Sequence, residues 1–79
     1  MTEPVIDIRG EPCGAPALRV ERFIQANPGV ASFVVLGDHP GTMETLRVLG
    51  ERHGLEVELS VDPSGDWRAR FERRGAAAS

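Results

Sequence analysis

The 79-residue chain has no tyrosine and no lysine, and it contains a single cysteine, Cys13. One cysteine cannot form a disulfide within the chain, which fits a protein of a reducing compartment. No apolar run approaches the roughly 20 residues that a membrane-spanning helix needs. The sequence opens without a basic segment and an apolar signal core, so we expect no export and a cytoplasmic location.

Positive charge is also scarce. Nine basic residues, all arginine, stand against twelve acidic ones, which gives a formal net charge of -3. Domains that bind nucleic acid on their own usually have a concentrated basic face, often with aromatic side chains among the charges. Aromatic residues make up only 5% of this chain. The composition therefore argues against autonomous binding of nucleic acid.

Several common catalytic patterns are missing. The glycines match turns and helix ends rather than a phosphate-binding or dinucleotide-binding loop. None of the serines stands in the sharp strand-to-helix turn that a hydrolase nucleophile needs. The metal ligands to consider are Cys13, His39 and His53, but their spacing matches no short metal motif. We therefore expect neither a bound metal nor an organic cofactor.

Hydrophobic periodicity divides the chain into six elements. Period-two or continuous apolar patterns predict strands, three- and four-residue spacings predict helices, and proline or glycine residues mark the boundaries. We expect a tail without structure at residues 75–79, which have nothing to pack. The predicted elements are a strand at 5–8, a helix at 16–26, a strand at 31–36, a helix that begins between Thr42 and Thr45 and ends near His53, and strands at 55–61 and 67–73.

This order, β-α-β-α-β-β, predicts an α/β (α+β) fold in one domain at residues 1–74. The last two strands alternate between apolar and charged residues, so one sheet face is packed and the other is wetter. Both helices should then cover the packed face, which gives a two-layer sandwich on a mixed four-stranded sheet. The first two strands should be parallel and joined by a right-handed crossover.

Cys13 lies between the first strand and the first helix, with Pro12 before it and Pro16 at the expected start of the helix. A helix N-terminus carries partial positive charge and free N–H groups, which favour the nucleophilic thiolate over the thiol. A lone cysteine is often a small buried hydrophobe, but a loop position between two prolines is poorly suited to a core. Glu11 opposes thiolate formation by repulsion, and Arg9 or Arg19 could offset it.

The run from Asp7 to Pro16 resembles the TusA/SirA-like sulfur-carrier family. The most specific part of the likeness is the pattern Gly-x-x-Cys-x-x-Pro, met by Gly10, Cys13 and Pro16. The later run Asp38-His39-Pro40 resembles the family's Asp-Asp-Pro loop, with His39 in place of the second aspartate. Gly14 stands where the family has the first proline of Cys-Pro-x-Pro.

The resemblance implies that Cys13 accepts a sulfane sulfur as a persulfide and passes it to an acceptor protein. The implied donors are cysteine desulfurases or rhodanese-type proteins, and no cofactor is implied. Arg9, Gly10, Gly14 and Pro16 would support the thiol, and Asp38, His39 and Pro40 would form a second loop of the site. We expect a monomer, because no long apolar surface is evident in the sequence.

A second interpretation keeps the fold and drops the chemistry. Gly14 would then mark a relaxed site, and the domain would be a non-catalytic module that binds a partner protein. An interaction module should show an ordinary pH profile of Cys13 alkylation and no persulfide, and a profile shifted to low pH would count against this second interpretation.

Overall fold

The computed structural model describes residues 3–10 and 15–73. Cys13, Gly14 and the tail at 75–79, on which several sequence predictions fall, lie outside the described residues. The elements follow the predicted order: β1 (Val5–Asp7), α1 (Ala15–Ala26), β2 (Ser32–Gly37), α2 (Pro40–Arg52), β3 (Leu55–Val61) and β4 (Trp67–Arg73).

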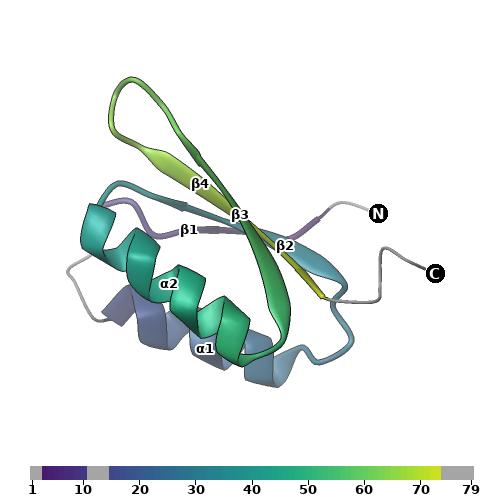
Figure 1. Cartoon of the computed structure of the whole chain (residues 1–79). Helices are drawn as coiled ribbons and strands as arrows, with labels where there is room; N and C mark the ends of the chain where they lie inside the picture. Colours follow the sequence, from purple (N-terminus) through teal and green to yellow (C-terminus); the bar gives the residue numbers. More distant parts are fainter. Residues whose placement is uncertain (1–2, 11–14, 74–79) are drawn as a thin grey trace.

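The four strands form one mixed sheet in the order β1-β2-β4-β3 (Figure 1). β1 pairs with β2 in parallel, and β4 pairs antiparallel with both β2 and β3. The last strand of the chain therefore lies inside the sheet, next to the first β-α-β unit. Its inward residues Trp67, Ala69 and Phe71 are buried, as an interior strand requires. The predicted mixed sheet is confirmed.

Both helices cover the same face of this sheet, which confirms the two-layer architecture (Figure 1). The rings of Phe33 on β2 and Phe71 on β4 stack with their centroids 4.7 Å apart. The helices close the core with apolar stripes at three- and four-residue spacing. The buried helix residues of this core are Val20 and Ile24 on α1 and Leu46 and Leu49 on α2.

α2 begins earlier than the sequence pattern predicts. It starts at Pro40 rather than between Thr42 and Thr45. Proline fits the first turn of a helix, because its missing N–H has no partner there and its fixed φ is already helical. His39 is the N-cap residue, and its carbonyl accepts the N–H groups of Thr42 and Met43. The run of loop-forming residues around Pro40 therefore includes the start of the helix.

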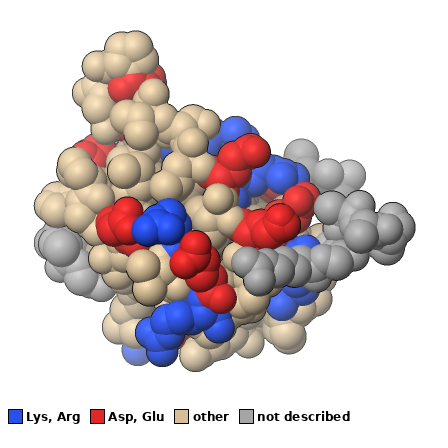
Figure 2. Space-filling view, in the orientation of Figure 1, with Lys and Arg blue, Asp and Glu red and all other residues tan. Residues whose placement is uncertain are grey.

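One face of the molecule carries charges of both signs. In the view of Figure 2, acidic and basic side chains lie interspersed over the face of the molecule. Neither helix of the described ranges is long and apolar enough to cross a membrane.

Candidate functional site

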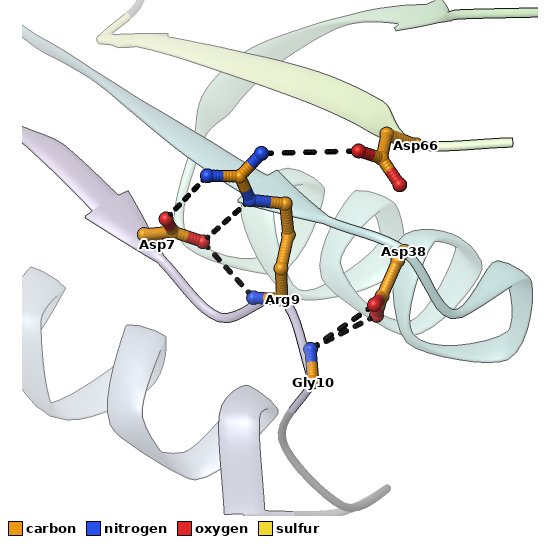
Figure 3. Close-up of polar contacts among 5 residues, drawn as sticks. All are labelled: Asp7, Arg9, Gly10, Asp38 and Asp66. Carbon is orange, nitrogen blue, oxygen red and sulfur yellow. Dashed lines mark hydrogen bonds and ion pairs between the residues drawn. The ribbon is translucent and has the colours of Figure 1, made fainter. Parts of the chain in front are cut away.

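Three chain segments meet at one edge of the sheet. β1 and β2 are parallel, so their carboxyl ends lie at the same edge, and α1 and α2 begin there. In open α/β sheets, this edge is where ligands are usually bound. The turn after β1, the loop after β2 and the end of the β3–β4 turn supply the residues of Figure 3.

The turn after β1 is joined to the loop after β2 by one backbone group. The Gly10 N–H donates to the Asp38 carboxylate, with N···O distances of 3.1 and 3.3 Å. Gly10 has a φ of +79°, a conformation that residues with a Cβ rarely adopt. The structure thus brings together two residues of the predicted site, Gly10 and Asp38, that are 28 positions apart.

Arg9 lies on the other side of this turn and is bound by two carboxylates (Figure 3). Its Nε and Nη2 donate to the two oxygens of Asp7 at 3.0 and 2.8 Å, and its backbone N–H donates to Asp7 at 3.1 Å. Its Nη1 lies 3.8 Å from Asp66. The Arg9 guanidinium is the main reason that the pKa of Asp7 is lowered to about 2, and the carboxylate in turn raises the pKa of Arg9. The Arg9 guanidinium is therefore held by the carboxylates of Asp7 and Asp66.

His39 contributes to the site through its backbone. Its carbonyl accepts a hydrogen bond from the Trp67 indole Nε1 at 3.0 Å, while its side chain is exposed and makes no capping bond. The Trp67 ring packs against the backbone of Gly37, where a Cβ would lie 2.2 Å from the ring. The loop after β2 is thus held in place by the first residue of β4.

Pro16 and Pro40 both occupy first turns of helices at this edge of the sheet. Pro16 is almost completely buried, so it fixes the beginning of α1 against the core. Pro40 is exposed and begins α2. The residue of greatest interest, Cys13, and its neighbour Gly14 lie outside the described residues, between the Gly10 turn and the start of α1.

Two site residues, Asp66 and Trp67, were missed by the sequence analysis. Asp66 fell between the strands predicted at 55–61 and 67–73, and Trp67 was placed only as the first residue of the second of these strands. Each reaches the site from the β3–β4 hairpin, far along the chain from Arg9 and His39. No local signal in the sequence identifies either contact, because both depend on β4 lying next to β2.

The two histidines considered as metal ligands, His39 and His53, lie far apart in the described part of the chain. His39 precedes the first residue of α2, and His53 follows the last, with 13 helical residues between them. At 1.5 Å per residue the two side chains are about 20 Å apart along the helix. His53 instead has its Nε2 3.6 Å from Glu21 of α1. Within residues 3–10 and 15–73, no group of three potential ligands has metal-binding geometry.

Comparisons with known proteins bear on the family and the fold of the chain. The model of a protein family described as "Sulfurtransferase TusA" matches residues 5–73. A crystal structure of a SirA-like protein from Desulfitobacterium hafniense superposes with a TM-score of 0.74 at 24% sequence identity, over 86% of this chain and 93% of that one. At this identity the structural likeness shows the fold. No curated protein matches the chain.

Proposed function

This chain belongs to the TusA family of sulfurtransferases, and from that membership we propose that it is a sulfur carrier that accepts a persulfide on Cys13. The sulfur comes from a donor protein, a cysteine desulfurase or a rhodanese-type protein, and passes to an acceptor protein. The family gives the carrier role in general. The cysteine, the persulfide and the relay are our assignment.

The supporting observation is the placement of the residues on either side of Cys13. Gly10 lies in the turn after β1, and Pro16 is buried in the first turn of α1. The chain therefore enters and leaves the cysteine segment at the carboxyl edge of the parallel strands. A helix N-terminus offers N–H groups and partial positive charge, which favour a thiolate and an anionic persulfide.

The proposed reaction needs no oxidant and no base from this chain. The Cys13 thiolate attacks the outer sulfur of the donor's persulfide, the donor S–S bond breaks, and the donor thiolate leaves. A nucleophile of the acceptor then attacks the outer sulfur on Cys13 and releases the Cys13 thiolate. Each step moves one sulfur atom between thiolates, so electrons balance within the pair.

The other residues of the site have supporting roles in this proposal. Asp38 holds the Gly10 turn through its carboxylate, and Asp7 fixes Arg9. His39 and Pro40 set the loop and the beginning of α2. Gly14 replaces a proline of the family pattern beside the thiol.

The test is to load the protein with sulfur and weigh it. Reduced wild-type protein and Cys13→Ser are incubated separately with a cysteine desulfurase plus cysteine, and with a rhodanese plus thiosulfate. We expect intact-protein mass spectrometry to show a gain of one sulfur atom on the wild type only, reversed by dithiothreitol. Circular dichroism verifies that the variant is folded.

Two results would contradict the proposal. One is an equal mass gain on Cys13→Ser, which would place the sulfur elsewhere. The other is a folded wild-type protein that gains no sulfur from either donor, which would favour the non-catalytic interaction module.

A further inference from the structure

A solvent-open groove of about 470 Å³ separates α1 from α2. Its floor and walls are largely apolar, with Ala17 and Leu18 from α1 and Val48 and Leu49 from α2. Leu18 and Val48 keep 49% and 46% of their surface exposed. They are two of the four exposed large hydrophobic residues in the described part of the chain. Their shared location indicates a surface that another molecule covers.

The charges that α2 adds to this groove have a symmetric order, while α1 adds Glu21, whose carboxylate lies 3.6 Å from His53 Nε2. Glu44, Val48 and Arg52 line it at four-residue intervals, so they form one stripe along α2. An acidic side chain lies one turn before Val48, and a basic one lies one turn after it. Within residues 3–10 and 15–73, no carboxylate is within ion-pair distance of Arg52. Glu44 shares Arg47 with Glu51.

We propose that this groove is the interface of a homodimer in which α2 of a second copy lies antiparallel in it. A twofold axis near Val48 then places Glu44 of each protomer opposite Arg52 of its partner. Val48 of each protomer packs beside Leu18 of the other. Such an isologous interface needs a surface that is complementary to itself, and the stripe has that property.

A second copy accounts for the stripe better than an unrelated protein does. An unrelated partner needs no matched acid and base at equal distances from a central apolar residue. The apolar area is small, so we expect a weak dimer that forms as concentration rises. The proposal replaces the expectation of a monomer, and it is independent of sulfur transfer.

The experiment is sedimentation equilibrium from micromolar to millimolar protein. The wild-type average mass should rise from one chain toward two. Glu44→Arg alone and Arg52→Glu alone should each weaken self-association by roughly tenfold, because each places like charges opposite one another in both symmetric contacts. Arg22→Glu makes the same change of charge on α1 outside the groove and should leave self-association unchanged.

Mixing the two groove variants gives the sharpest result. A heterodimer of Glu44→Arg with Arg52→Glu has an opposite-charge pair at both contacts, so an equimolar mixture should associate more tightly than either variant alone. The double variant with both changes should associate like the wild type. A wild-type mass of one chain at every concentration would overturn the proposal, as would self-association that the charge variants do not alter.

Discussion

At the residue scale, two carboxylates determine the turn that leads toward Cys13. Asp38 accepts the Gly10 N–H, and Asp7 holds both the side chain and the backbone N–H of Arg9. Each carboxylate therefore has a measurable consequence.

The Asp38 contact is tested by Asp38→Ala beside Asp38→Asn. Alanine removes the acceptor, so the free energy of unfolding should fall by about 1 kcal/mol. Asparagine keeps an oxygen acceptor and removes only the charge, so its loss should be smaller. Urea unfolding measures both, and hydrogen exchange should show faster exchange of the Gly10 amide in the alanine variant. Equal Gly10 protection in Asp38→Ala and wild type would contradict the assigned contact.

The stabilisation that Asp7 contributes to the folded protein should be lost at low pH. Its pKa in the folded protein is about 2, below the ordinary value of 3.8, mainly because of the hydrogen bond from the Arg9 side chain. A lowered pKa means that the stabilisation is fully present above the unfolded value and is lost as the pH falls through the folded one. The difference in unfolding free energy between wild type and Asp7→Asn should therefore be constant above about pH 4 and shrink toward pH 2.

An NMR titration of the Asp7 side-chain carboxyl carbon measures the same quantity directly. Its midpoint should lie near pH 2. A midpoint close to the ordinary pKa of 3.8 would mean that the ion pair with Arg9 does not form in solution.

Some residues of the site could be predicted from the sequence, and others could not. Gly10 and Asp38 were identified only through the resemblance to a known family, while Pro16 was also predicted from its fit to the first turn of a helix. Asp66 and Trp67 left no local signal, since their roles depend on which strand pairs with β2. The sequence also could not show that Arg9 is engaged by Asp66.

At the element scale, the close approach of α2 to the sheet depends on Gly50. A Cβ at this position would lie 2.5 Å from Val57 and 2.8 Å from Phe71. Phe71 is fully buried and stacked on Phe33, so it has little room to move. The helix therefore packs closely on β3 and β4 only because this residue has no side chain.

Gly50→Ala should destabilise the protein although alanine is the better helix former. The gain in helix propensity is about 1 kcal/mol, while overpacking a closed core costs about 1–3 kcal/mol. We expect a net loss of unfolding free energy in urea. Gly41→Ala is the matched control on the same helix, because its Cβ would approach only the exposed His39 ring, at 3.1 Å. That variant should be neutral or slightly stabilised, and equal effects of the two changes would contradict the packing account.

The bounds of some helices and strands were predicted more accurately than those of others. β3 and β4 have the predicted bounds because strict alternation leaves little freedom in their ends. The start of α2 was wrong because Pro40 lies among loop-forming residues that suit both a loop and a first helical turn. The position of β4 between β2 and β3 could not be deduced, since a hairpin fixes only the pairing of its own two strands.

At the scale of the whole molecule, the two-layer fold followed from the number of helices and the single apolar face of the last two strands. The arrangement of the site could not be predicted in this way, because its three chain segments come together only in the folded sheet. The likeness to a known family supplied what physical patterning could not, namely the proposal that Cys13 carries sulfur.

The central claim, that Cys13 carries sulfur that can be passed on, is tested most directly by cyanolysis of the loaded protein. Cyanide attacks the outer sulfur of a persulfide, leaves as thiocyanate and returns the thiolate. After removal of donor and free sulfide, wild-type protein should release one equivalent of thiocyanate per loaded chain, and Cys13→Ser should release none above background. Equal release from both proteins, or none from folded wild type after exposure to both donors, would contradict the claim.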